Sequence, residues 1–273
     1  MTTITGSTTG PATHGAWRGT LRVAEYRLRN MWKWRNSIIA FGLGNPVLYL
    51  ASVGLGVGLL VNEGSGGVDG VPYLVFLAPA LLAAAAIQGG QDEVTFPTLA
   101  GFIWEKLFFA MRATSLTGAQ IANGVLLAAA ARVVFTTVIY WLVLALFGAV
   151  GWTSVLPLVT VSTVAGVCWA AVMLAITANV TNEDGFLAFT WRLVIMPMFL
   201  FSGTFYPLSS LPLALQWIGW ISPLWHATQL GRWLSYGMPL AAWQAALSVC
   251  YLLAMGVVGI VVARRRFERR LTA

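Results

Sequence analysis

The chain has 273 residues, of which 58% are hydrophobic and only 9% are charged, and its mean hydropathy is +0.78. Soluble domains carry about 25% charged residues, so this composition argues strongly against a soluble globular enzyme. The net charge of +7 comes from 16 Lys and Arg against nine Asp and Glu, and most of the basic residues lie towards the chain ends. That distribution is typical of membrane topology rather than of nucleic-acid binding. The composition predicts an all-α integral membrane protein.

The first 36 residues divide into two parts. Residues 1–15 have no Lys, Arg, Asp or Glu and no apolar run, so we expect a disordered N-terminus and no signal peptide. Residues 16–36 predict an amphipathic helix in the membrane interface, with its Arg side chains at anionic headgroups. Its apolar face would hold Trp17, Leu21, Leu28, Met31 and Trp32. A solvated basic tail is the alternative, and the spacing of the Trp residues disfavours it.

Six later stretches are apolar over the ~20 residues that a helix needs to cross a bilayer. They cover residues 38–61, 72–91, 121–148, 155–178, 186–206 and 240–263. Turn-like residues at 62–67, 151–154 and 179–185 separate several of them. We therefore expect six transmembrane helices.

The distribution of Lys and Arg predicts the orientation of these spans. Six precede the first span, two lie between the second and third, and five follow the sixth, whereas the loops on the other side hold only Arg232. Because cytoplasmic loops carry the excess of Lys and Arg, both termini are expected in the cytoplasm.

Two connecting segments are too hydrophobic for plain loops. A short helix is expected over residues 101–113, on the cytoplasmic side, resting on the membrane or covered by a partner protein. Between the fifth and sixth spans, Pro207, Pro212, Pro223 and Pro239 delimit two short apolar helices. Neither is long enough to cross, so residues 207–235 predict a re-entrant extracellular hairpin.

Three local sequences resemble one known family. They are WEKLFFAMRATSLTG at Trp104–Gly118, NEDGFLAF at Asn182–Phe189, and Pro197–Arg232, which contains FLFSGTFYPLSSLP and ISPLWHATQLGR. With the order of elements, they resemble the ABC-2 type exporter permeases over nearly the whole chain, so that residues 16–273 would form one ABC-2 transmembrane domain. The most similar branch is that of the nodulation-factor (lipo-oligosaccharide) and daunorubicin-type drug export permeases. Ser115 departs from that branch, which usually has proline there.

The resemblance implies the permease subunit of a bacterial ATP-driven exporter in the plasma (inner) membrane. Such a permease moves an amphipathic or lipid-linked cargo (drug, glycolipid or lipo-oligosaccharide) outward. It works with two copies of a separate ATPase, which binds ATP and Mg, and with a second permease copy, here a homodimer. Accordingly, the sequence has no G-x-x-x-x-G-K-[ST] phosphate loop. We expect no catalytic residue, metal or cofactor in this chain, contacts with membrane lipids, and no nucleic-acid partner.

By the same resemblance, the helix at 101–113 couples the permease to the ATPase. Its aromatic residues are expected to be exposed and to seat in a groove of the ATPase, with charged residues at the rim, because aromatic and Arg anchors dominate interface energetics. The residues concerned are Trp104, Glu105, Lys106, Phe108, Phe109 and Arg112. An interfacial helix that only rests on lipid is the alternative.

Two arginines, Arg132 and Arg192, fall inside predicted spans, where a charge costs ~2.5–3.5 kcal/mol and needs a partner. Carboxylates lie near the same predicted membrane face. We hypothesise an ion-pair belt that transmits the ATPase stroke, formed by Asp92, Glu93, Arg132, Glu183, Asp184 and Arg192. Snorkelling of the Arg side chains to the headgroups is the alternative.

The family places the transport path along spans 2 and 5, between two permease copies. The end of the fifth span is rich in Met and Phe, which suits an apolar, adaptable wall or outer gate. Its residues are Met198, Phe199, Phe201, Gly203, Phe205 and Tyr206. An ordinary lipid- or core-facing helix is the alternative.

Two rival functions need features that this sequence lacks. A secondary transporter or channel not driven by ATP would want carboxylates at mid-span, and none lies there. A membrane-embedded enzyme would want converging polar groups, but the chain has only two His, and His226 fits a hydrogen-bonded structural residue.

Overall fold

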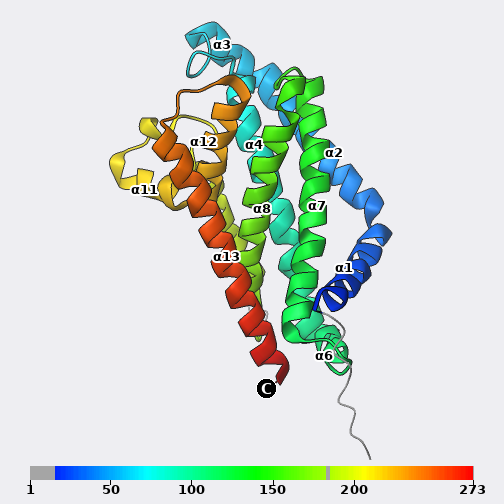
Figure 1. Ribbon diagram of the computed structural model, residues 1–273. Coiled ribbons are helices and arrows are strands. Elements are labelled where there is room, and N and C mark those ends of the chain that lie inside the picture. The colour runs from blue at the N-terminus through cyan, green and yellow to red at the C-terminus, as the bar shows by residue number, and fades with distance from the viewer. Residues whose placement is uncertain (1–15, 183–184, 273) are drawn as a thin grey trace, which may run out of the picture.

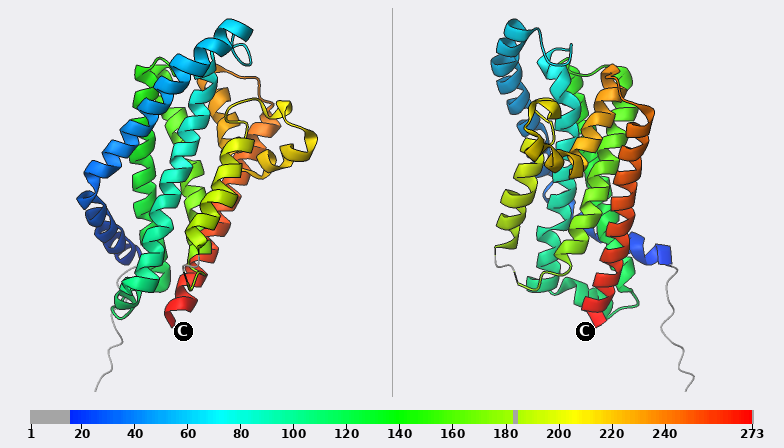
Figure 2. Two further views of the ribbon diagram at one scale, coloured as in Figure 1. Left: turned by 180° about the vertical axis from the view of Figure 1, so that it is seen from behind. Right: turned by 90° about the vertical axis from the view of Figure 1, so that its left-hand side faces the viewer.

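The computed structural model describes residues 16–182 and 185–272, and these form a bundle of helices that stand side by side (Figures 1 and 2). The last turns of α13, the short helix α6 and the start of α1 lie at the lower end as drawn in Figure 1, and α3 lies at the upper end. The predicted disordered segment 1–15 and the predicted belt residues Glu183 and Asp184 lie outside the described residues.

The helices follow the predicted order. In the first half they are α1 Ala16–Lys33, α2 Arg35–Ser52, the π-helical turn η1 Val53–Val57, α3 Gly58–Ser65, α4 Tyr73–Val94, α5 Phe96–Leu99, the π-helical turn η2 Ala100–Trp104, and α6 Leu107–Arg112. In the second half they are α7 Gly118–Leu146, η3 Trp152–Ser154, α8 Val155–Thr177, α9 Phe186–Thr190, the π-helical turn η4 Trp191–Ile195, α10 Met196–Phe201, η5 Leu208–Ser210, α11 Leu213–Ile221, α12 Pro223–Tyr236 and α13 Ala242–Thr272.

Four helical stretches within the described residues are long and apolar enough to cross a membrane, so the chain is an integral membrane protein. They are Tyr73–Trp104, Gly118–Leu146, Trp152–Thr177 and Ala242–Thr272, and a shorter apolar helix covers Phe186–Phe201. They contain most of the second, third, fourth and sixth predicted spans. The last helix runs nine residues beyond its predicted end at 263, because Phe267 and Leu271 bury one face of the Arg-rich extension.

Small residues let the central helices approach closely. A Cβ on Gly166 of α8 would lie 2.5 Å from the carbonyl oxygen of Ala86 in α4, and one on Gly256 of α13 would lie 2.5 Å from the sulfur of Cys168 in α8. Helix association in a membrane relies on such close packing, because lipid supplies no hydrophobic force between helices. Helix α8 thereby joins α4 and α13 into one block.

Helix α1 packs across the lower part of α7. Its Val23 is buried against Gly124, where no Cβ could fit, and Arg27 lies on the same buried face. The predicted apolar residues lie mainly on the exposed face, where Trp17 and Trp32 are 67% and 69% exposed. The helix is thus amphipathic, with a second, inward face that the sequence pattern did not reveal.

The segment predicted as a hairpin forms two helices, α11 and α12, beside the upper half of the bundle (Figure 2). Helix α12 packs on α4 and α8 through Leu224, Ala227 and Leu230, whereas Trp217 and Trp220 of α11 are about half exposed. The two short helices are present as expected, and their depth in a bilayer stays a prediction.

Candidate functional site

The predicted coupling helix is divided in two. Residues Ala100–Trp104 form a π-helical turn, the backbone breaks at Lys106 in the left-handed region (φ 53°), and α6 covers only Leu107–Arg112. Gly101 makes this fold possible, because a Cβ there would lie 2.6 Å from the ring of Phe108. The segment is a compact knuckle rather than one helix over 101–113. We call residues 100–112 the knuckle.

The knuckle exposes some of its aromatic residues and buries others. Trp104 is 52% exposed and Phe109 is 39% exposed, as expected. The expectation that Phe108 is exposed was wrong, since its side chain is fully buried. The reason is a three-ring cluster, in which the ring centroid of Phe108 lies 4.8 Å from that of Phe102 and 5.4 Å from that of Phe267 in α13.

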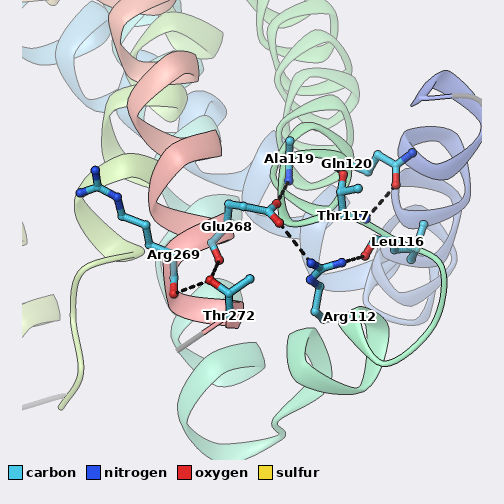
Figure 3. A network of polar contacts seen from close by, with 8 residues as sticks. All are labelled: Arg112, Leu116, Thr117, Ala119, Gln120, Glu268, Arg269 and Thr272. Atoms are coloured by element: carbon cyan, nitrogen blue, oxygen red, sulfur yellow. Dashed lines mark hydrogen bonds and ion pairs between the residues drawn. The ribbon is translucent and has the colours of Figure 1, made fainter. Parts of the chain in front are cut away.

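The charged residues of the knuckle differ in their partners. The Arg112 guanidinium forms an ion pair with Glu268 of α13 at 3.2 Å and donates a hydrogen bond to the carbonyl oxygen of Leu116 (Figure 3). The ammonium of Lys106 lies 5.8 Å from the ring centroid of Phe109. Glu105 is exposed at the break between the two helical pieces. The knuckle therefore presents Trp104, Glu105 and Phe109 outward while Arg112 holds it to α13.

A buried charge cluster surrounds Glu93, close to the C-terminal end of α4. Oε1 of Glu93 accepts from Nη2 of Arg27 at 3.1 Å, and Oε2 accepts from Nη1 of Arg132 at 3.0 Å. The Glu93 and Arg27 side chains are 4% and 6% exposed, and Arg132 is 23% exposed. Burial lowers the pKa of Arg27, while the Glu93 carboxylate opposes that shift. One carboxylate thus ties α1, α4 and α7 together.

The structure brings together only part of the predicted belt. Glu93 and Arg132 are paired, and Asp92 lines a cavity beside them. Arg192 lies on η4 and is exposed, and its predicted neighbours Glu183 and Asp184 are not among the described residues. Arg27 was not predicted. The sequence feature that could have indicated its burial is its spacing from Thr20, Val23 and Ala24. This spacing places Arg27 on the same face of α1 as those residues, opposite the exposed Trp residues.

Beside this cluster is a cavity of about 680 Å³. It is bounded by α1, α2, α4, the knuckle and α7, and its charged lining residues are Arg27, Asp92, Glu93, Glu105 and Arg132. Trp34, Phe96 and Tyr140 add aromatic surface. The cavity can therefore hold a group that has both hydrogen-bonding and apolar parts.

A smaller cavity of about 190 Å³ lies on the other side of α4, against α10 and α12. Met198 and Phe199 of the predicted path line it, together with Ile87, Trp191 and Leu224. Its lining is almost entirely apolar. Gln88 of α4 lines both cavities, so a single polar side chain stands at the border between them.

Of the remaining predicted path residues, Phe201 is the last residue of α10, and Gly203, Phe205 and Tyr206 lie in the tight turn that follows it. Gly203 is in the left-handed region (φ 70°), and the ring centroids of Phe199 and Phe205 lie 5.1 Å apart. The hydroxyl of Tyr206 donates to the carbonyl oxygen of Leu200, and Phe201 is partly buried.

Arg232 of α12 holds this turn, and sequence reasoning missed it. Its guanidinium donates to the carbonyl oxygens of Gly203 at 2.9 Å and Phe76 at 3.3 Å, and it lies 3.7 Å from the centroid of the Phe76 ring. Burial lowers its pKa to about 10, so the group stays charged at neutral pH. The sequence feature that could have indicated this role is that Arg232 is a lone Arg within the apolar segment 207–239.

His226 is a structural residue, as expected. Its Nε2 lies 3.0 Å from the carbonyl oxygen of Trp220, and its Nδ1 lies 3.0 Å from the hydroxyl oxygen of Ser248. Because a carbonyl only accepts, Nε2 carries the proton and Nδ1 accepts from Ser248. Burial lowers the pKa of His226, which keeps the ring neutral.

Comparison of the sequence with known proteins identifies the family of the chain. The family profile described as ABC-2 type transporter matches residues 21–236. The chain belongs to the ABC-2 type transporter family. The membrane proteins of this family are the transmembrane components of ABC transporters, are generally not catalytic themselves, and work with an ATP-binding subunit.

Several curated relatives of this ABC-2 protein share the name nodulation protein J. That of Rhizobium leguminosarum bv. viciae is 31% identical over 246 residues, which cover 89% of this chain and 92% of the relative. That of Rhizobium meliloti (strain 1021) is 30% identical over 252 residues, which cover 91% and 93%. The similarity therefore extends over almost the whole of both chains.

Proposed function

We propose that the chain is the permease subunit of a bacterial ATP-driven exporter, which a separate ATPase subunit drives from the cytoplasmic side. The family match is the observation that carries this proposal. The knuckle supports it, because Trp104 and Phe109 are exposed and the helix α6 of the knuckle lies at the same end of the bundle as the Arg-rich last turns of α13 (Figure 1). Aromatic anchors of this kind dominate protein interfaces.

The proposed topology has six spans in the inner membrane with both termini in the cytoplasm. The four long apolar helices supply four of the spans. The first is the continuous run of α2, η1 and α3 over 35–65, and the fifth is the run Phe186–Phe201. Residues 207–235 would form the re-entrant hairpin on the outer side. Two permease copies, as a homodimer, and two ATPase copies would complete the transporter.

We further propose an amphipathic or lipid-linked cargo, outward transport, and recognition by the two cavities on either side of α4. A polar head fits the larger cavity, with its charged and aromatic lining, and an apolar tail fits the smaller one beside Met198 and Phe199. Gln88 lies at the junction of head and tail. In this arrangement the intramembrane pair Glu93–Arg132 is a wall of the path.

Co-purification tests the subunit assignment. The chain is co-expressed with its partner ATPase, and ATP hydrolysis is measured for the complex and for each subunit alone. We expect the complex to hydrolyse ATP and the permease alone to be inactive. The double variant Trp104→Ala/Phe109→Ala should lose the ATPase on purification, whereas Trp217→Ala, which removes a similarly exposed aromatic side chain of α11 beside the upper half of the bundle, should retain it. Hydrolysis by the purified permease alone would overturn the proposal.

Stimulation of hydrolysis tests the cargo class. In nanodiscs, lysophosphatidylethanolamine should raise the ATPase rate of the complex, whereas its detached headgroup, glycerophosphoethanolamine, should not. Met198→Trp, which fills the smaller cavity, should weaken the stimulation. Equal stimulation by the headgroup alone would contradict an amphipathic cargo.

A further inference from the structure

The last nine residues of α13 pack onto the knuckle. The Phe267 ring is fully buried, with its centroid 4.9 Å from that of Phe102 and 5.4 Å from that of Phe108. Both partner rings belong to the knuckle. Aromatic pairs at these separations stabilise beyond the area that they bury, so the contact is specific rather than incidental. A segment that the sequence presents as a basic tail is therefore part of the packed core of the helix bundle.

The next residue of α13, Glu268, extends this contact. Glu268 pairs with Arg112 of α6 at 3.2 Å and accepts from the backbone N–H of Ala119, at the start of α7, at 3.3 Å (Figure 3). Gly118 leaves no room for a side chain, since a Cβ there would lie 2.7 Å from the Cα of Glu268. The backbone of α13 thus lies directly against the first turn of α7.

Arg270 makes the contacts of α13 with Phe102 of the knuckle and with the end of α8. Its guanidinium carbon lies 4.1 Å from the centroid of the Phe102 ring, and Nη1 donates to the carbonyl oxygen of Ala178 at the end of α8 at 3.0 Å. We call Phe267, Glu268 and Arg270 the C-terminal clamp. The clamp joins the knuckle, the start of α7 and the end of α8 to one helix.

The place of the clamp gives it a mechanical consequence. Along the chain the knuckle follows α4 and the short helix α5, with a helix break at Thr95 between those two helices, and the left-handed residue Lys106 divides the knuckle itself. The clamp joins the same knuckle directly to α13, a continuous helix of 31 residues that runs to α12 at the upper end. From the exposed Phe109, ring contacts lead to Phe102, at a centroid distance of 6.1 Å, and from Phe102 to Phe267 of α13, at 4.9 Å, so the outer surface of the knuckle is connected to α13 through packed side chains.

We propose that the C-terminal clamp carries nucleotide-driven motion from the knuckle to α13, with Phe267, Glu268 and Arg270 as positioning residues. This inference rests on the proposed function, because it needs an ATPase that acts on the knuckle. It adds the sixth predicted span to the moving parts and assigns a role to the Arg-rich C-terminal end.

Amide hydrogen exchange over residues 264–272 tests the inference in the complex with its ATPase. We expect the exchange rate of this segment to differ several-fold between the nucleotide-free complex and the complex trapped with ATP and vanadate. In Arg112→Glu the difference should vanish, and in the double variant Arg112→Glu/Glu268→Arg, which restores the pair with reversed charges, it should return. Arg269→Gln is the matched control, since its side chain points away from this network and is exposed (Figure 3).

The outcomes separate this inference from the proposed function. Suppose that the wild-type complex hydrolyses ATP but that residues 264–272 have the same amide exchange rate with and without trapped nucleotide. The clamp then carries no motion, and this inference is refuted while the proposed function stands. If Arg112→Glu retains the wild-type difference, this inference is also refuted. Should Arg112→Glu not fold, Arg112→Gln and Phe267→Leu take its place with the same expected loss. If no ATPase associates with the wild-type chain, the proposed function itself fails.

Discussion

Replacing Glu93 by Gln perturbs the most buried charge cluster of the described residues while keeping the shape of the side chain. In the wild type the carboxylate balances two guanidinium groups, those of Arg27 and Arg132, at 3.1 and 3.0 Å. Glutamine keeps one acceptor oxygen but no charge. Arg27, whose side chain is only 6% exposed, would then lack its direct counter-charge.

The expected loss of folding free energy follows from the burial of the Arg27 and Glu93 side chains. Removing one partner of a buried ion pair costs about 3–5 kcal/mol, because the other charge is left desolvated. The lower end of that range, about 3 kcal/mol, fits Glu93→Gln, because one hydrogen bond survives and the partly exposed Arg132 can reach water. For a protein of this size such a loss lowers the apparent melting temperature by about 6–12 °C.

Fluorescence-detected size-exclusion chromatography of heated, detergent-solubilised protein measures that temperature. Glu105→Gln is the matched control: Glu105 lines the same cavity, but it is exposed, and we expect almost no change. The double variant Arg27→Gln/Glu93→Gln should recover much of the loss, because both charges of that pair are removed together. An unchanged melting temperature in Glu93→Gln, or a double variant that loses the sum of both single effects, would refute the reasoning.

Three further predictions use the same heating assay. Arg232→Leu should be destabilised by at least about 2 kcal/mol, because the carbonyl oxygens that it serves stay buried without a donor, and a melting temperature near that of the wild type would contradict this. Gly166→Val should cost about 1–3 kcal/mol by overpacking against Ala86, and equal yields of monodisperse protein before and after heating would speak against it. Since the folded pKa of His226 is lowered, the unfolded state binds its proton first, so stability should fall as the pH drops below about 6.5. His226→Asn should flatten that decline, and an unaltered pH profile would rule His226 out as its cause.

The elements that depend on local pattern were predictable. A stretch of apolar residues long enough to span a bilayer needs no tertiary information, and the helices α4, α7 and α8 start and end within a few residues of their predicted bounds. Proline positions likewise indicated the two short helices α11 and α12. The exposed face of α1 followed from the spacing of its Trp residues.

The side-chain partners were not predictable, because they depend on which helices meet. Periodicity places Phe108 and Phe109 on different faces of a helix but does not say which face meets a neighbour, so Phe108 was assigned outward although it lies in the core. The pairing of Arg27 with Glu93 spans 66 residues, and no local rule connects them. The extension of α13 was hidden because five arginines in seven residues outweigh one Phe in a hydropathy average.

Photo-crosslinking asks whether the proposed ATPase subunit contacts the permease at the knuckle. A benzoyl-phenylalanine is placed at Trp104 or Phe109, and at Trp217 as the control, in cells that express both subunits. We expect a crosslinked permease–ATPase product from positions 104 and 109 and none from position 217. Crosslinks from 104 and 109 to lipid alone, with the ATPase present and active in the same membranes, would contradict this expectation.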